Sequence, residues 1–333
     1  MCKAADNTAS TAARAAPFIG LLLPLGNAEF ASQAKAVAQG CEAALALIPE
    51  RPALKVLASD ATPARVLSEY RAAVADRAAV IVGPMTRSGV SALVSSASVD
   101  VPTLALNAPE QAGKLPPLME TMGLTIEPEA RAVARAAFAQ GLRDAVIFEE
   151  RGAFATRSAR AFTSQWLELG GWVSAAEPIA ADTDLKLLAE RMARSQADLV
   201  FLAADADHAR LVIPYAVKPV FATSQINDGR TDAGANIELN GVRFVDMPWL
   251  LQPDHPAVMI YPRESSLSIE LQRFYALGID ACRAANERLR DSGPLHLDGV
   301  IGDLLLRAGR PAERNPMQAV FRDGVAVALE PRP

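Results

Sequence analysis

The sequence predicts an α/β protein with two lobes, each built on a parallel sheet that helices cover on both faces. Short and almost continuously apolar runs alternate with helical stretches of small and charged residues, and this alternation lapses once and then restarts. Continuous apolar strands are typical of parallel sheets that are buried on both faces. The length of 333 residues also fits two domains of ordinary size.

The first unit is expected to contain four strands with helices between them. Pro49 and Pro52 would end its first helix. Thr62 followed by Pro63 matches the start of its second helix, where a threonine caps the helix and a proline takes the first position. The expected strands are 18–23, 54–57, 80–82 and 103–106, and the expected helices are 28–47, 62–74 and 88–96.

The second unit follows a connector at 108–122 that contains proline and glycine. Phe162 and Trp166 lie four residues apart on an expected helix, so they share a face that indicates core packing. A long amphipathic helix at 267–290 and a tail of small antiparallel strands from Gly293 complete the chain. The expected strands are 145–148, 172–176, 199–203, 220–222 and 242–245, and the expected helices are 128–138, 155–169, 185–194 and 207–213.

This order of elements predicts an interrupted chain path. We expect a flexible N-terminal tether at 1–16, a first lobe made of 17–120 and 256–292, and a second lobe made of 121–255 and 293–330. Each lobe would then be a parallel sheet flanked by helices, with a cleft between the two.

Composition excludes several classes of protein. Hydrophobic residues make up 50% of the chain and aromatic residues 5%, which suffices for aliphatic cores. A net charge of -5 without a Lys/Arg run argues against a nucleic-acid partner. No apolar run is long enough to span a membrane. Walker, dinucleotide-binding, zinc-protease and nucleophile-elbow motifs are missing from the sequence, so we expect no catalytic residues and no cofactor.

The three cysteines allow at most one disulfide. Cys41 and Cys282 lie in alanine-rich helical stretches, where a small buried side chain is the ordinary interpretation and a disulfide between them is the alternative for an exported chain. Cys2 follows the initiator methionine and precedes the tether. It is either the lipidated cysteine of a bacterial lipoprotein or part of a cytosolic N-terminus, and composition does not decide between them.

Turn residues follow the strands of both expected sheets. Ligands of open parallel sheets bind in the crevice at the carboxyl ends of the strands, so these residues could orient a small polar ligand. The alternative is that they are turn residues that any such sheet requires. The candidate cleft residues are Pro24, Asn27, Gly83, Pro84, Asn107, Arg151, Asp205, Thr223, Ser224 and Asp246.

The run Asp205-Ala206-Asp207-His208 is the one cluster that resembles a metal site. Two carboxylates and an imidazole are suitable ligands for a divalent cation. Carboxylates at the start of a helix also cap it and interact favourably with its positive end. We favour capping and expect no metal.

Several runs resemble one family of known proteins. The two lobes and the late helix that returns to the first of them resemble the type I periplasmic binding-protein fold, whose lobes are joined by three crossovers. Ile81-Val82-Gly83-Pro84 and Leu104-Ala105-Leu106-Asn107 are similar to first-lobe runs of the LpoA family of penicillin-binding protein activators. The run Asp246-Met247-Pro248-Trp249-Leu250-Leu251 is the most specific match, and the resemblance covers about 17–330.

This resemblance implies a periplasmic lipoprotein that Cys2 anchors to the inner leaflet of the outer membrane. It also implies direct contact with a class A penicillin-binding protein, a bifunctional peptidoglycan synthase, which the lipoprotein activates. Lys3 is compatible with sorting to the outer membrane. The best-known members carry a helical-repeat domain ahead of this fold, and here only a short tether separates Cys2 from the first strand.

Two functions follow from these patterns. We favour a non-enzymatic regulator over a periplasmic receptor that binds an amino acid or small peptide and feeds an ABC transporter. A receptor for amino acids would present hydroxyls after its third and fourth strands to hold the carboxylate. In this chain those two places hold Gly83-Pro84-Met85 and Asn107-Ala108-Pro109.

One further set of residues is a candidate for contact with the partner protein. We expect it to form either an anchor for that protein or part of the hinge between the lobes, and its members are Met247, Pro248, Trp249 and Leu250.

Overall fold

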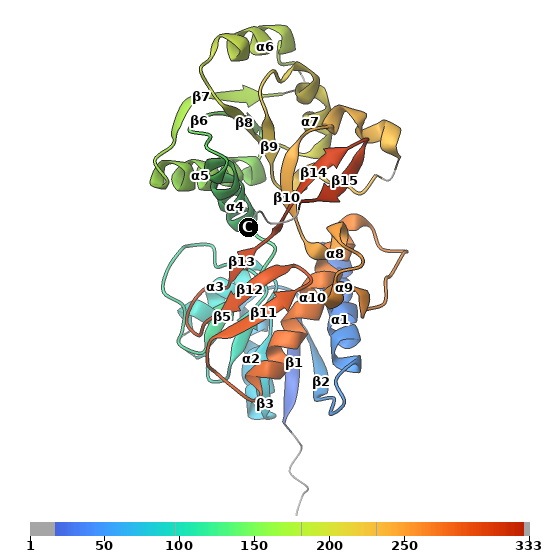
Figure 1. Ribbon diagram of the computed structural model, residues 1–333. Coiled ribbons are helices and arrows are strands. Elements are labelled where there is room, and N and C mark those ends of the chain that lie inside the picture. The colour runs from blue at the N-terminus through green and yellow to red at the C-terminus, as the bar shows by residue number, and fades with distance from the viewer. Residues whose placement is uncertain (1–16, 97, 181, 231, 330–333) are drawn as a thin grey trace, which may run out of the picture.

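The computed structural model describes residues 17–96, 98–180, 182–230 and 232–329. The chain forms two lobes, one above the other in Figure 1, and passes between them three times. The two-lobed α/β architecture expected from the sequence is confirmed. Cys2 and the expected tether at 1–16 lie outside the described residues.

The sheet of the first lobe is parallel throughout and has the order β2-β1-β3-β4-β5. Its edge strand β5 was expected to be part of a connector, but it pairs with β4 from Thr103↔Met119 to Ala105↔Thr121. The strands are β1 (Phe18–Leu23), β2 (Ala53–Ala58), β3 (Ala78–Val82), β4 (Thr103–Ala105) and β5 (Met119–Thr121).

Helices cover both faces of the first sheet. The helices α1 (Ala31–Ala46) and α10 (Ile269–Arg288) pack on one face, and α2 (Pro63–Ala75) and α3 (Arg87–Ser95) pack on the other. Every residue of β1 is buried, because alternate side chains point into these two cores.

The sheet of the second lobe has the order β15-β14-β10-β9-β8-β6-β7. The strands from β6 to β10 are parallel, and β14 and β15 are antiparallel additions at one edge. The strands are β6 (Asp144–Glu150), β7 (Trp172–Ile179), β8 (Leu199–Ala203), β9 (Val220–Ala222), β10 (Arg243–Asp246), β14 (Met317–Arg322) and β15 (Val325–Ala328).

Helices also cover both faces of the second sheet. One face carries α4 and α5, and the other carries α6 and α7. On α5 the rings of Phe162 and Trp166 stack at 5.4 Å inside the core, as their spacing predicts. The helices are α4 (Ile126–Ala139), α5 (Ala153–Glu168), α6 (Leu185–Arg194) and α7 (Ala206–Val212), and the 3-10 turns are η1 (Ile213–Tyr215), η2 (Ser224–Ile226) and η3 (Ala233–Leu239).

A third sheet corrects the expected division of the chain. Its strands β11 (Leu295–Gly299), β12 (Gly302–Leu306) and β13 (Glu313–Asn315) are antiparallel. Leu304 and Leu306 belong to the core of the first lobe. The sequence pattern placed all of 293–330 in the second lobe, whereas only β14 and β15 pair there. Short alternating strands do not reveal which core their apolar side chains enter.

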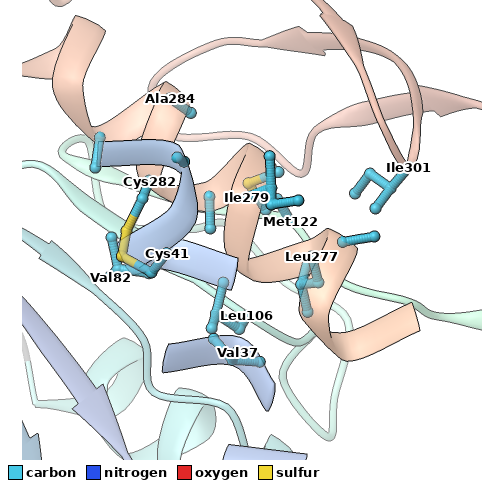
Figure 2. Packing of buried hydrophobic residues seen from close by; sticks show 14 of the residues in the cluster. Val37, Cys41, Val82, Leu106, Met122, Leu277, Ile279, Cys282, Ala284 and Ile301 are labelled. Carbon is cyan, nitrogen blue, oxygen red and sulfur yellow. A yellow bond between two sulfur atoms is a disulfide. The ribbon is translucent and has the colours of Figure 1, made fainter. Parts of the chain in front are cut away.

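The helices α1 and α10 approach each other closely. A Cβ atom on Gly40 would clash with the carbonyl oxygen of Tyr275, and one on Gly278 would clash with that of Val37. At this crossing Cys41 and Cys282 form a disulfide with a Cα–Cα distance of 5.1 Å (Figure 2). Of the alternatives for these cysteines, the structure shows the disulfide.

Within the described ranges, no helix is both long enough and apolar enough to cross a membrane.

Candidate functional site between the lobes

Three crossovers connect the lobes. The first joins β5 to α4, the second joins β10 to α10 through the short helices α8 (Pro248–Leu251) and α9 (Pro256–Met259), and the third joins β13 to β14. Charged side chains from both lobes meet beside these crossovers.

Arg273 of α10 reaches from the first lobe into the second. Its Nη2 lies 2.8 Å from Oδ2 of Asp246, at the end of β10, and donates to the carbonyl oxygens of Ser224 and Asn227 at 3.2 and 3.0 Å. The same carboxylate oxygen accepts a hydrogen bond from Nδ2 of Asn227 at 2.9 Å. One arginine therefore holds the turn after β9 and the end of β10 against α10.

Arg314 of β13 makes a second connection between the lobes. Its Nη2 lies 2.9 Å from Oε1 of Glu129 on α4 and donates to the carbonyl oxygen of Thr125 at 3.3 Å. The other oxygen of Glu129 accepts the backbone N–H of Ser224 at 3.1 Å. Ser224 thus joins both ion pairs into one set of contacts, which we call the interlobe network. Its members are Glu129, Ser224, Asn227, Asp246, Arg273 and Arg314.

The interlobe network is shielded from water. The side chains of Asp246 and Arg273 are 1% and 15% exposed, and those of Glu129 and Arg314 are 7% and 4% exposed. Burial alone would lower the pKa of Arg273, but the adjacent Asp246 carboxylate more than offsets this and raises that pKa above its ordinary value. Arg273 is therefore held in its charged form, and separating the lobes would break its ion pair with the Asp246 carboxylate.

The expected anchor or hinge set lies beside this network. Trp249 is fully buried, and its Nε1 donates to Oε1 of Gln272 on α10 at 2.8 Å. Met247 and Trp249 belong to the core of the first lobe, whereas Leu251 belongs to a core of the second. Pro248 is buried and Leu250 is partly buried. The Trp249 ring therefore presents no free surface to a partner in this structure, and it packs in the core of the first lobe two residues before Leu251 enters a core of the second.

The ten candidate cleft residues are not brought together in one cavity. Asp246 and Ser224 belong to the interlobe network, and the Asn107 side chain donates to the carbonyl oxygen of Met85 at 3.1 Å. Asp205 and Thr223 line a cavity of about 20 Å³, and Arg151 lines a separate pocket near Glu177. The other candidates lie in the strand-end turns of the first lobe: Pro24, Asn27, Gly83 and Pro84.

A different cavity, of about 410 Å³, lies between the first and third crossovers. Residues 108–113 and the start of α4 line it together with residues of β12 and β13. All ten candidate cleft residues are described by the structure, and none of them lines this cavity. The residues that do line it come from loops, helices and strands, and none of them was predicted from its place after a strand.

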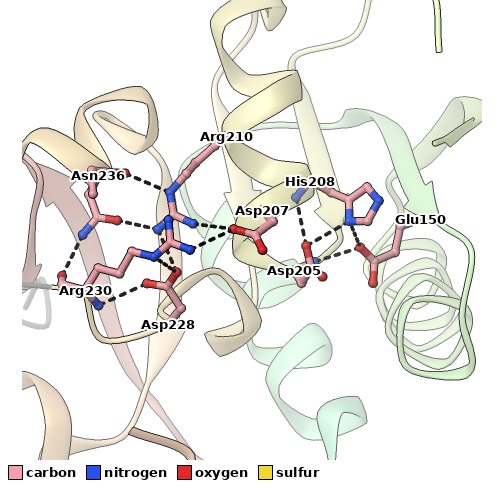
Figure 3. A network of polar contacts seen from close by, with 9 residues as sticks. Glu150, Asp205, Asp207, His208, Arg210, Asp228, Arg230 and Asn236 are labelled. Atoms are coloured by element: carbon pink, nitrogen blue, oxygen red, sulfur yellow. Dashed lines mark hydrogen bonds and ion pairs between the residues drawn. The ribbon is translucent and has the colours of Figure 1, made fainter. Parts of the chain in front are cut away.

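Glu150, Asp205 and His208 form a compact polar cluster (Figure 3). The Nδ1 atom of His208 lies 2.9 Å from a carboxylate oxygen of each acidic residue. Asp205 also accepts the backbone N–H of His208 at 2.9 Å, which is the capping arrangement favoured from the sequence. The imidazole thus forms a hydrogen bond with Asp205 and lies at ion-pair distance from Glu150.

A separate polar cluster in the same figure fixes the η3 segment (Figure 3). Arg210 of α7 contacts Asp207 and Asp228, and it donates to the Asn236 side chain at 2.7 Å. Because its side chain is only 12% exposed, Arg210 acts as a structural residue of the second lobe.

The pKa of His208 gives a testable pH dependence. The hydrogen bond to Asp205 raises this pKa above its ordinary value, burial opposes the rise, and the charges of Asp205 and Glu150 add to it. The resulting stabilisation is fully present below about pH 6.5 and is lost as pH rises through the higher folded-state pKa. In an NMR titration of the imidazole, we expect a midpoint above 6.5 that falls in Asp205→Asn, a substitution that keeps a capping side chain. An unchanged midpoint in that variant would contradict this assignment.

The comparisons with known proteins place this chain in a family. The family described as "LppC putative lipoprotein" matches residues 12–190 and 180–324, so the chain belongs to it. The penicillin-binding protein activator LpoA of Photobacterium profundum is 27% identical over 94% of this chain and 57% of its own length. The LpoA of Edwardsiella piscicida is 27% identical over 68% of this chain and 39% of its own length. The chain thus spans about half the length of these relatives.

Solved structures share the fold. The LpoA C-domain of Haemophilus influenzae, described as a regulator of PBP1A, has a TM-score of 0.77 at 20% identity and covers 94% of this chain and 99% of its own. A structure described as a "putative branched-chain amino acid ABC transporter" from Chromobacterium violaceum has a TM-score of 0.79 at 36% identity. That match covers 92% of this chain and all of the other.

Proposed function

We propose that this protein is a non-enzymatic regulator that binds and activates a class A penicillin-binding protein. The observation that carries the proposal is the match, over 94% of this chain, to a protein named penicillin-binding protein activator LpoA. The interlobe network supports it, because lobes joined by buried ion pairs form a platform of fixed shape on which a partner can dock.

The test is a reconstituted assay of peptidoglycan synthesis. Purified protein with Cys2 replaced by alanine is added to the class A synthase of the same organism, and glycan polymerisation and peptide crosslinking are followed separately. We expect at least one rate to rise in proportion to complex formation. If both rates stay unchanged and calorimetry instead shows tight binding of a free amino acid, the regulator function is wrong.

A solute receptor for an ABC transporter is the second candidate. The structure that is 36% identical and described as a transporter component favours it. Two features of this chain oppose it. The turns after β3 and β4 hold Gly83-Pro84 and Asn107-Ala108 instead of hydroxyl groups. The interlobe network also has to break before the lobes can open for a solute to enter.

We further propose that Cys2 carries the lipid that anchors the protein to the inner leaflet of the outer membrane. Membership of a lipoprotein family supports an acylated cysteine. Each buried methylene of an acyl chain contributes about 0.8 kcal/mol, so two or more chains hold a protein at a membrane.

Replacing Cys2 should change where the protein is found. In cells that express the native precursor, Cys2→Ala is expected to move the protein from the outer-membrane fraction to the soluble periplasmic fraction. Cys41→Ala/Cys282→Ala serves as the control, because it changes cysteines without touching the proposed acylation site. Continued recovery of Cys2→Ala in the outer-membrane fraction would rule out this anchor.

A further inference from the structure

The 410 Å³ cavity between the first and third crossovers has the size of a small-molecule site. It lies outside the interlobe network except for Arg314, which contributes to both. Its walls come from the two lobes, because residues 108–115 and β12 belong to the first and α4 belongs to the second.

Most of the wall is apolar. Leu115, Met122, Ile301 and Leu304 line the cavity and are each at most 3% exposed, and several proline and alanine residues line it as well. A ligand that fills this space therefore gains from burying an aliphatic or aromatic body.

The positive charges at the cavity are only partly used. Arg87 donates to the carbonyl oxygens of Pro109 and Glu110, which leaves its charge without a carboxylate. Arg131 lines the cavity and makes no hydrogen bond or ion pair within the described part of the chain. The side chain of Arg314 is only 4% exposed and pairs with Glu129, but its Nε atom is buried without a hydrogen-bond partner.

Arg314 is already paired with Glu129, and two further acidic residues line the cavity. Glu127 lines the cavity but is engaged by Arg157, whose Nε lies 2.9 Å from its Oε1. Glu110 is exposed and is the other acidic residue of the lining. The α4 helix begins at the cavity with Thr125 as its N-cap, and Glu127 and Glu129 lie in its first turn.

We propose that this cavity binds a small monocarboxylate with an apolar body. The carboxylate lies against Arg131 near the start of α4, and the body lies against Leu115, Ile301 and Leu304. A charged hydrogen bond to a guanidinium provides the orientation, and burial of the apolar body provides most of the affinity. Because α4 and β12 come from different lobes, the bound molecule would contact both.

Calorimetry on the Cys2→Ala full-length protein tests the proposal with benzoate and octanoate as probes. Benzyl alcohol supplies the apolar body without the charge, and phenylalanine adds an ammonium group. We expect saturable binding of at least one carboxylate and a roughly tenfold or larger loss for benzyl alcohol. No binding of either carboxylate, or equal binding of benzyl alcohol, would overturn the proposal. Tighter binding of phenylalanine than of benzoate would also overturn it, because an amino-acid site would then be present.

A pair of variants on one helix locates the site. Arg131→Gln removes a partly exposed arginine that lines the cavity, and we expect carboxylate binding to weaken about tenfold. Arg135→Gln removes an exposed arginine one turn further along α4 that does not line the cavity, and we expect binding to stay within about twofold. Equal effects of both variants would mean that the carboxylate binds elsewhere. The synthase assay measures the regulator function independently of carboxylate binding. A failure of the regulator proposal and a failure of the carboxylate-site proposal can therefore be told apart.

Discussion

Arg273→Met is expected to lower the free energy of unfolding by about 3–5 kcal/mol. The substitution leaves the carboxylate of Asp246 1% exposed and without its cationic partner, and it also removes two hydrogen bonds to the carbonyl oxygens of Ser224 and Asn227. Breaking one side of a buried ion pair costs far more than the pair contributes, because a desolvated charge remains. Chemical denaturation followed by circular dichroism measures the change.

Two variants make this prediction specific to the buried pair. Arg194→Met removes an arginine of α6 whose pair with Glu190 is exposed on both sides, so we expect a change below about 1 kcal/mol. The double variant Arg273→Met/Asp246→Leu removes both charges and should recover much of the lost stability. If Arg273→Met destabilises no more than Arg194→Met, the interlobe network does not hold the lobes together.

The disulfide between Cys41 and Cys282 supplies the second large effect. It joins residues 241 positions apart, so it strongly restricts the unfolded chain. Chain-entropy arguments and removals of native disulfides give about 2–5 kcal/mol for such a bond. We expect Cys41→Ala/Cys282→Ala to lose stability in this range relative to the oxidised protein, measured by denaturant unfolding.

The same bond gives a control for the disulfide prediction. Adding a reductant should destabilise the native sequence and leave Cys41→Ala/Cys282→Ala unchanged, because that variant has no bond between these positions to reduce. If the reductant leaves the native sequence equally stable, the bond does not contribute to its folding. The glycine contact between α1 and α10 stays intact in both proteins, so the comparison isolates the disulfide.

The local sequence pattern was sufficient to predict most helices and strands of the fold. The expected strand at 18–23 matches β1, and Thr62 caps α2 by accepting the N–H of Arg65, as its place before Pro63 predicts. Apolar runs and capping residues carry this information because they act within a few neighbouring residues. The short edge strand β5 was missed because only its pairing with β4 makes it a strand.

The site was less predictable because its contacts are distant in the chain. Arg314 pairs with Glu129, 185 residues away, and Arg273 pairs with Asp246, 27 residues away. An arginine that forms a buried ion pair has the same neighbouring residues in sequence as an arginine that is exposed to solvent. Local sequence therefore does not indicate the buried ion pairs. Asp246 was expected at the cleft from its place after a strand, and the structure shows it turned toward α10 instead.

The lobes are expected to keep a fixed arrangement and to act as a platform for a protein partner. Spin labels at Val56 of β2 and Leu187 of α6, which are both 44% exposed, allow the interlobe distance to be measured by pulsed electron paramagnetic resonance on a Cys2→Ala background. We predict one narrow distance distribution that free amino acids leave unchanged. A broad distribution that an amino acid narrows and shortens would contradict the claim and would show a receptor that closes on its solute.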